Sequence, residues 1–127
     1  MEYKDLIGIP FRLHGRSPED GLDCYGLVME VYRRMGIDLF DYDYDDSPRN
    51  TGADLFEEHK AHEFSEVVGP PQEGDVVVLG NGMGTHCGVF VRGNRVLHAR
   101  DSVGVVSEAV RSLKPFIVGV HRHKCLA

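Results

Sequence analysis

The stretch GLDCYGLVMEVYRRMG, residues 21–36, decides how the rest of this sequence is interpreted. Its apolar side chains recur at the spacing that gives a helix one buried face. Asp23 stands where a side chain can cap the first turn, and Gly36 stands where glycine commonly ends a helix. The pattern therefore predicts a helix that has Cys24 in its first turn and a buried stripe made of Leu27, Val28, Val31, Tyr32 and Met35.

Cys24 has two interpretations at that position. A free thiol has a pKa of about 8.5, so little of it is ionised at neutral pH. The unpaired N–H groups and the partial positive charge of a helix N-terminus favour the thiolate, which predicts a nucleophile. Cysteine is also among the residues most often buried, so a structural thiol is the alternative.

The segments around this helix are predicted to be short or irregular. Residues 2–11 open as a short helix that stops near Pro10, because the residue before a proline is pushed out of the helical region. Residues 13–21 are rich in turn-forming residues, and the acidic residues 38–52 are typical of a solvated surface loop.

A second helix is predicted over residues 53–64. His59 and His62 lie three residues apart on it, which is a spacing compatible with a pair of metal ligands. Exposed helical histidines are commoner than ligands, so no metal site is assigned here.

The pattern changes to a period of about two residues in the second half of the chain, which indicates strands separated by glycine, asparagine and proline. The order of elements predicts an α+β domain, with N-terminal helices packed on a C-terminal antiparallel sheet of about five strands. We expect a single domain over residues 1–127, and its strands lie in residues 75–80, 86–93, 94–100, 102–110 and 115–123.

Two histidines occupy one predicted hairpin, and its loop length decides whether they meet. A two-residue loop would pair Val89 with His98 and place His86 on the opposite face of the sheet. A three-residue loop over residues 92–94 pairs Gly88 with His98 instead, so that His86 becomes a diagonal neighbour on the same face. A single bulge has the same result. A catalytic pair therefore requires a hairpin longer than the minimum.

Composition excludes several classes of function. The chain has 127 residues and a net charge of -6 with no basic run, so we expect no nucleic-acid partner. No apolar run approaches the roughly 20 residues of a membrane helix, and the first residues lack a secretory signal pattern. We therefore expect synthesis in the cytoplasm and no membrane partner. Three cysteines cannot all pair, so at least one thiol is free.

Two stretches together resemble a known family. GIPFRLHGRSPEDGLDCYGLV resembles the start of the NlpC/P60 cysteine peptidases, and EGDVVVLGNGMGTHCGVFVRGNRVLHAR resembles their second half. The spacing between His86 and His98 matches the family's usual spacing, and the resemblance covers residues 9–100. It implies a papain-like α+β core in which Cys24 is the nucleophile, His86 the general base and then acid, and His98 the residue that orients His86.

The resemblance also implies a substrate. Family members hydrolyse peptide bonds in the stem peptides of peptidoglycan, commonly between D-γ-glutamate and diaminopimelate, and they use no metal or cofactor. Because the chain shows neither a signal peptide nor a wall-binding module, we expect delivery by another component. The short form is similar to family members encoded with phage tail proteins, so phage tail proteins are the expected partners.

Several positions depart from the family's pattern. Phe11 aligns with a tyrosine whose hydroxyl assists at the oxyanion site, His14 replaces the first glycine of a Gly-Gly pair, Tyr25 replaces a serine, and Cys87 replaces a valine. As a strand residue, Cys87 is expected to point away from His86 and toward the core. The side chains expected to contact substrate are Phe11, His14, Asp23, Tyr25 and Asp101, although capping is the simplest role for Asp23 and a turn the simplest for Asp101.

Three alternatives remain open. A metal site is one, although no close Cys-x-x-Cys pair supports it. Its candidate ligands are Cys24, His86, Cys87 and His98, with His121, His123 and Cys125 in the tail. An acyltransferase or amidase on the same scaffold is the second. A non-catalytic tail or assembly component that keeps the fold is the third.

Overall fold

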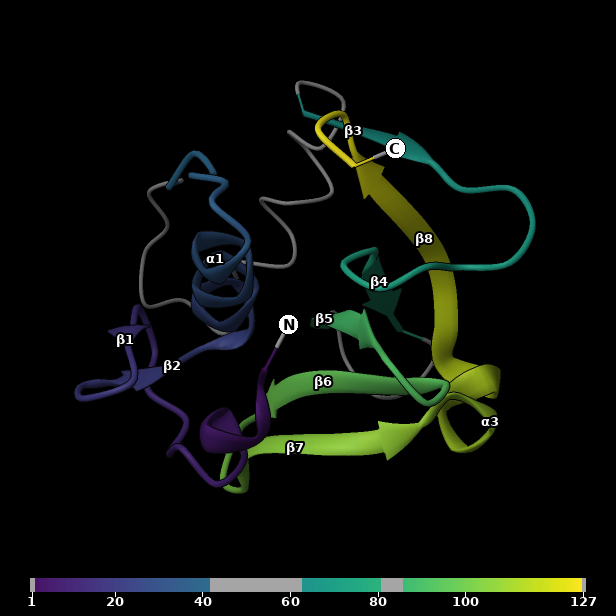
Figure 1. The fold of residues 1–127 in the computed structure, drawn as a ribbon. Coiled ribbons are helices and arrows are strands. Elements are labelled where there is room, and N and C mark those ends of the chain that lie inside the picture. The colour runs from purple at the N-terminus through teal and green to yellow at the C-terminus, as the bar shows by residue number, and fades with distance from the viewer. Residues whose placement is uncertain (1, 42–62, 81–85, 127) are drawn as a thin grey trace.

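In the described residues, an 11-residue helix packs on a curved antiparallel sheet (Figure 1). The structure, a computed structural model, describes residues 2–41, 63–80 and 86–126. The main sheet has the strand order β3-β8-β4-β5-β6-β7, and β1 and β2 form a separate small hairpin. The elements are η1 (Lys4–Leu6), β1 (Arg16–Ser17), β2 (Gly21–Leu22), α1 (Cys24–Arg34), β3 (Phe64–Glu66), β4 (Val76–Leu79), β5 (His86–Val91), β6 (Arg95–Arg100), β7 (Gly104–Ala109), α3 (Val110–Leu113), η3 (Lys114–Phe116) and β8 (Ile117–His123).

The predicted central helix is confirmed as α1. It begins at Cys24, and the carboxylate of Asp23 caps it by accepting the N–H of Gly26 at 2.7 Å. It ends at Arg34, two residues before Gly36, whose φ of 80° turns the chain away. In the described ranges, no helix is long and apolar enough to span a bilayer.

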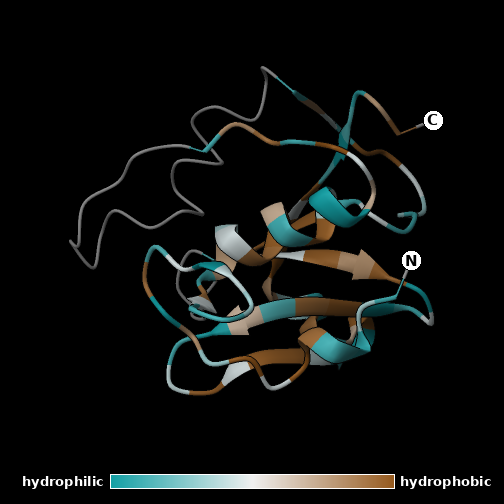
Figure 2. Cartoon of the chain, turned by 60° about the vertical axis from the view of Figure 1, so that its left-hand side comes forward, coloured by the Kyte–Doolittle hydropathy of each residue, from teal (hydrophilic) through white to brown (hydrophobic). Residues whose placement is uncertain are grey.

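Both faces of the sheet are covered, which explains the continuous apolar run of β4. Val76 and Val78 face the large core beneath α1, whereas Val77 and Leu79 face a second cluster. That second cluster includes side chains from α3 and η3. Alternate residues of one strand thus enter opposite cores, and the strands beneath α1 carry much of the hydrophobic colour in Figure 2.

An ion pair fixes the middle of the sheet. Asp75 is fully buried at the start of β4, and its two carboxylate oxygens accept from Nε and Nη2 of Arg122 on β8, each at 2.9 Å. The N–H of Gln72 adds a third hydrogen bond at 2.9 Å. A bidentate pair of this kind holds β4, and therefore its neighbour β5, in a defined position relative to β8.

The α+β class is confirmed, but two details of the prediction are wrong. The main sheet has six strands in the described residues rather than about five, because β3 pairs with β8 through Phe64 opposite His123. The sequence pattern placed Phe64 at the end of the helix predicted over 53–64, and only a contact with a distant strand makes it a strand residue. The rest of that predicted helix, with His59 and His62, lies outside the described residues.

The expectation of several N-terminal helices is the second correction. Among the described N-terminal residues, α1 is the only α-helix, and the helix expected over 2–11 is reduced to the 3-10 turn η1. The chain leaves that turn at Gly8, where φ is 94°. Its backbone then pairs with the edge of β7, since Gly8 N–H donates to Val105 and Val105 N–H donates to Ile9. Covering an exposed sheet edge outweighs the local helical preference.

Candidate functional site

Cys24 lies at the N-terminus of α1, where its sulfur meets the beginning of β5. The side chain is 5% exposed and belongs to the core beneath the helix. The largest influence on the pKa of Cys24 is hydrogen bonding from Cys87, which lowers it. The hydrogen bond and the positive charge of His86 lower this pKa further, whereas burial and the negative charge of Asp23 raise it. The balance lowers the pKa of Cys24 to about 5. The thiolate is therefore the main form at neutral pH, as a nucleophile requires.

The hairpin between β5 and β6 has the three-residue loop that a histidine pair requires. Gly88 pairs with His98 and Val91 with Arg95, which leaves residues 92–94 as the loop. His86 Nε2 lies 2.7 Å from His98 Nδ1, so the two rings meet as predicted. A Cβ at Gly88 would lie 2.8 Å from the Cβ of His98, so glycine makes room beside that ring.

His98 is fully buried, and its second nitrogen reaches an acidic residue on β7. Nε2 of His98 lies 3.1 Å from Oε1 of Glu108, and the same oxygen accepts from Nη1 of Arg100 at 3.3 Å. Burial and the positive charge of His86 lower the pKa of His98 to about 4, against the opposing effect of Glu108. The ring of His98 is therefore neutral at physiological pH.

Sequence reasoning missed Glu108, although a signal for it existed. Glu108 pairs with Val96, which makes it the diagonal neighbour of His98 on the same face of the sheet. Extending the register analysis across the next hairpin, from β6 to β7, would have brought the two side chains together.

Cys87 is fully buried in the core that also contains Cys24, as the alternation of β5 predicted. The prediction did not include its contact with the Cys24 sulfur. A thiol is a weak hydrogen-bond donor, and donation to a neighbouring thiolate stabilises the charged form. Cys87 therefore supports the ionisation of Cys24 together with His86.

The loop before Cys24 is tied to the helix through the carboxylate of Asp23. Besides capping α1, this carboxylate accepts from Nη1 of Arg16 at 2.9 Å and from the N–H of His14 at 2.8 Å. Nε of Arg16 in turn donates to Asp41 at 3.0 Å. Asp23 is 2% exposed, so the structure gives it a structural role, and the expected contact with substrate stays a prediction.

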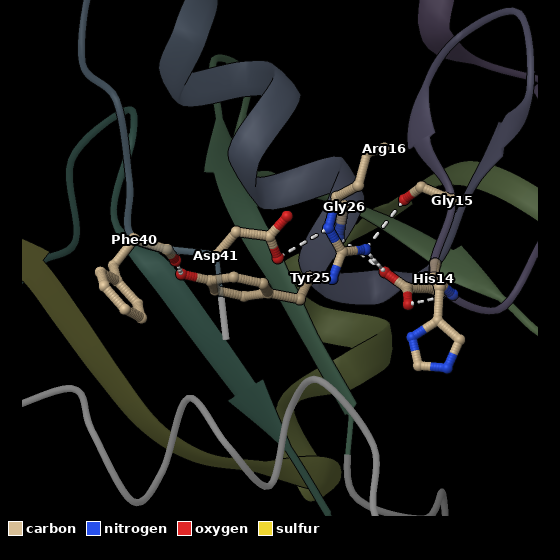
Figure 3. Close-up of polar contacts among 8 residues, drawn as sticks. His14, Gly15, Arg16, Tyr25, Gly26, Phe40 and Asp41 are labelled. Carbon is tan, nitrogen blue, oxygen red and sulfur yellow. Dashed lines mark hydrogen bonds and ion pairs between the residues drawn. The ribbon is translucent and has the colours of Figure 1, made fainter. Parts of the chain in front are cut away.

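Tyr25 is an anchor for the segment that follows α1. It is 1% exposed, and its hydroxyl donates to the carbonyl of Phe40 at 2.6 Å (Figure 3). The guanidinium of Arg16 lies over its ring, with Cζ 5.8 Å from the ring centre. The departure from serine thus has a packing reason, and an additional contact with substrate remains a prediction.

The other three expected substrate contacts lie nearer the surface. Phe11 is half-buried against the core beneath α1 and brings no hydroxyl to the site. His14 is exposed and adopts a φ of 63°, a left-handed conformation that explains why glycine suits this position. Asp101 is exposed in the turn between β6 and β7. Their roles toward substrate stay predictions.

The side chain of His123, one of the three tail residues considered as metal ligands, has other contacts. Nε2 of His123 lies 3.3 Å from Oε2 of Glu63, and its Nδ1 accepts the N–H of Cys125 at 3.0 Å. In residues 2–41, 63–80 and 86–126, no three histidine, cysteine, aspartate or glutamate side chains gather as a metal site would require.

The backbone of the loop at Gly15 packs directly on the first turn of α1 at Gly26, where a side chain would leave no room. A Cβ at Gly26 would lie 2.0 Å from the carbonyl oxygen of Gly15. Alanine normally stabilises a helix by about 1 kcal/mol relative to glycine. Here we expect Gly26→Ala to destabilise the protein by about 2 kcal/mol or more, because the loop backbone must move.

Urea denaturation followed by circular dichroism measures this change in the free energy of unfolding. Gly80→Ala is the matched control, because the nearest atom to its new Cβ is a valine methyl at 3.4 Å. A Gly26→Ala variant as stable as the unmodified protein would contradict the close packing described here.

Comparison with known proteins places this arrangement in context. The model of the NlpC/P60 family matches residues 8–122. The chain is 41% identical over 83 residues to tail tip assembly protein K of Escherichia phage N15, a match that covers 60% of this chain and 34% of that protein. It is 30% identical over 109 residues to the murein DD-endopeptidase MepS/murein LD-carboxypeptidase of Escherichia coli K12, covering 83% of this chain and 50% of the relative. The chain thus spans a third to a half of the length of these curated relatives.

Two solved structures have a similar fold. One is a lipoprotein-like protein of the NLP/P60 family from Staphylococcus aureus subsp. aureus Mu50, with a TM-score of 0.61 and 25% identity over 91% of this chain and 36% of that one. The other is the NlpC/p60 domain of the peptidoglycan hydrolase SagA, with a TM-score of 0.61 and 21% identity over 92% of this chain and 89% of that one.

Proposed function

Because the chain belongs to the NlpC/P60 family, we propose that it is a cysteine peptidase that hydrolyses peptide bonds in the stem peptides of bacterial peptidoglycan. The observation that carries this proposal is the contact between an acidic thiol and a histidine pair. Cys24 has a pKa of about 5 beside His86, and His86 is hydrogen-bonded to His98 at 2.7 Å. A thiolate next to a proton donor is the arrangement that thiol-based acyl transfer needs.

The proposed reaction has two halves. In the first, the Cys24 thiolate attacks the carbonyl carbon of the scissile peptide bond, and His86 gives its proton to the leaving amine. The C–N bond breaks and the acyl group remains on sulfur as a thioester. In the second, His86 takes a proton from water, the resulting hydroxide attacks the thioester, and the acid product leaves. His98 holds the imidazole of His86 in position through both halves.

Charge develops on the carbonyl oxygen during each attack, so hydrogen-bond donors are required nearby. The N–H of Cys24 at the beginning of α1 has the position and the helix dipole to serve. The ring of Phe11 carries no hydroxyl, so this chain relies on other donors than its family's tyrosine. Removing one donor in a known oxyanion hole costs about 2.7–4 kcal/mol, which sets the scale of that difference.

The proposed bond is the one between D-γ-glutamate and diaminopimelate. The relative from Escherichia coli carries the name of a murein DD-endopeptidase and LD-carboxypeptidase, so a substrate panel must also contain DD-cross-linked and LD-terminated peptides. An acyltransferase on the same scaffold would pass the thioester to an acceptor amine rather than to water. Mass spectrometry of the products separates these outcomes.

A phage tail is the proposed carrier. The 41% identity to a tail tip assembly protein supports this delivery, and it also favours the second candidate function, a non-catalytic assembly component. A nucleophile with a pKa of about 5 favours the enzyme, since an assembly role has no need of an ionised thiol.

Incubation with purified substrates tests the proposal. We expect the isolated chain to cleave soluble stem peptides and to release new amines, but to digest intact cell walls poorly, because delivery is left to the carrier. Mass spectrometry of the peptides and turbidity of a wall suspension are the two measurements, with Cys24→Ala as the blank. Absence of cleavage across the whole panel would contradict the enzyme, and rapid lysis of intact walls would contradict the carrier.

A further inference from the structure

Glu108 reaches the histidine pair from β7 and completes a continuous chain of contacts that starts at the sulfur. His86 Nε2 is 2.7 Å from His98 Nδ1, and His98 Nε2 is 3.1 Å from Oε1 of Glu108. We propose that Glu108 is a positioning residue of this site, acting through His98 to orient His86 toward Cys24. The inference rests on the proposed function and adds a fourth member to its machinery.

The argument begins with the direction of the hydrogen bonds. An ionised carboxylate only accepts, so the nitrogen of His98 that faces Glu108 must carry a proton. Neutral His98 then has its lone pair on Nδ1, which can only accept from Nε2 of His86. His86 is left with its Nδ1 for the proton exchanged with the Cys24 sulfur. Glu108 thus selects the one tautomer of His98 that aligns His86.

Charged groups lie at both ends of the histidine pair. On the helix side, the Cys24 sulfur meets His86, with the thiol of Cys87 and the carboxylate of Asp23 as further influences. On the sheet side, Glu108 faces His98 from β7, and Arg100 of β6 shares the same carboxylate oxygen at 3.3 Å. Glu108 raises the pKa of His98 and Arg100 lowers it, so the two charges act on the histidine pair in opposite directions.

The charges of Glu108 and Arg100 can be changed by mutation without disturbing the core, because both side chains are more exposed than that of His98. The side chain of His98 is fully buried, whereas that of Glu108 is 28% exposed and that of Arg100 is 43% exposed. Replacing either of the latter two alters charge near the surface and does not open the core. The effect on Cys24 can therefore be separated from a loss of folding.

Alkylation of Cys24 by iodoacetamide tests the inference without any substrate. The rate is followed by peptide mass spectrometry as a function of pH, and its midpoint reports when the thiolate forms. Glu108→Gln keeps an acceptor oxygen but removes the charge, so we expect the midpoint to rise by about half a pH unit. Glu108→Leu removes both and raises it further. Arg100→Gln lowers the midpoint, because it removes a charge of the opposite sign.

Controls separate positioning from general damage. Glu66→Gln makes the same substitution on β3, at the far edge of the sheet, and is expected to leave the midpoint unchanged. Thermal denaturation of each variant confirms that it is folded. With a cleaved stem peptide, Glu108→Gln is expected to lower kcat and leave KM unchanged, since Glu108 acts through His98.

Two results would overturn the inference. One is a midpoint that neither Glu108 variant moves, and the other is a shift in the same direction for Glu108→Gln and Arg100→Gln. Failure of the proposed function is a different observation. If the unmodified chain cleaves no stem peptide, but the Glu108 and Arg100 variants shift the midpoint in opposite directions, the proposed substrate is wrong and the positioning role of Glu108 stands.

Discussion

Replacing Cys24 with alanine removes cleavage of soluble stem peptides, and kcat/KM falls by at least about 10⁴-fold. The methyl group cannot attack the peptide carbonyl and cannot form the thioester. A fluorescent or mass-based peptidase assay measures the loss. Substitution of a buried cysteine by a smaller side chain leaves the fold in place, which circular dichroism confirms.

The other two cysteines provide the controls for this variant. Cys125 is exposed near the C-terminus, and Cys125→Ala is expected to keep full activity. Cys87→Ala is expected to keep activity but to raise the pKa of Cys24, because it removes the hydrogen bond that lowers this pKa most. Complete loss of activity in Cys87→Ala alone would contradict the assignment of Cys24 as the nucleophile.

Replacing His86 with glutamine is expected to have the second largest effect. It removes both the positive charge that favours the thiolate and the acid that protonates the leaving amine, so kcat falls by about 10²–10⁴-fold. The pKa of Cys24 rises from about 5 toward the ordinary thiol value of about 8.5. The thiolate is therefore lost between these two pH values, and alkylation at pH 6 becomes slow.

The pH dependence of alkylation and the peptidase assay measure these two effects separately. Cys125, alkylated in the same sample, is the internal reference and is expected to react equally in both proteins. His98→Gln is expected to give a smaller shift, because His98 acts on the sulfur only through His86. An unchanged midpoint in His86→Gln would contradict the thiolate–imidazolium pair.

The features that could be predicted from the sequence depend on local rules. The helix over Cys24–Arg34 follows from an apolar stripe between a capping aspartate and a glycine. The period of a strand predicts that His86 and His98 share a face only if the loop has three residues or the hairpin has a bulge, and the structure has the three-residue loop. Both inferences use residues close together in the chain.

The features that could not be predicted depend on distant contacts. β3 forms by pairing with β8, where Phe64 lies opposite His123, and the residues next to Phe64 in the sequence do not predict this pairing. The contacts of Tyr25 with Phe40 and of Asp23 with Arg16 likewise arise from the packing of loops onto α1. Asp23 and Tyr25 hold the loops that surround the beginning of α1, and their expected contacts with substrate stay predictions.

Titration of Cys24 in the unmodified protein addresses the ionised nucleophile most directly. Per-cysteine alkylation rates, read by mass spectrometry across a range of pH, give the protonation midpoint of this one sulfur. Ionisation supported by Cys87 and His86 predicts a midpoint near 5. A midpoint near that of a free thiol, about 8.5, would mean that neither side chain stabilises the thiolate and would contradict the site described here.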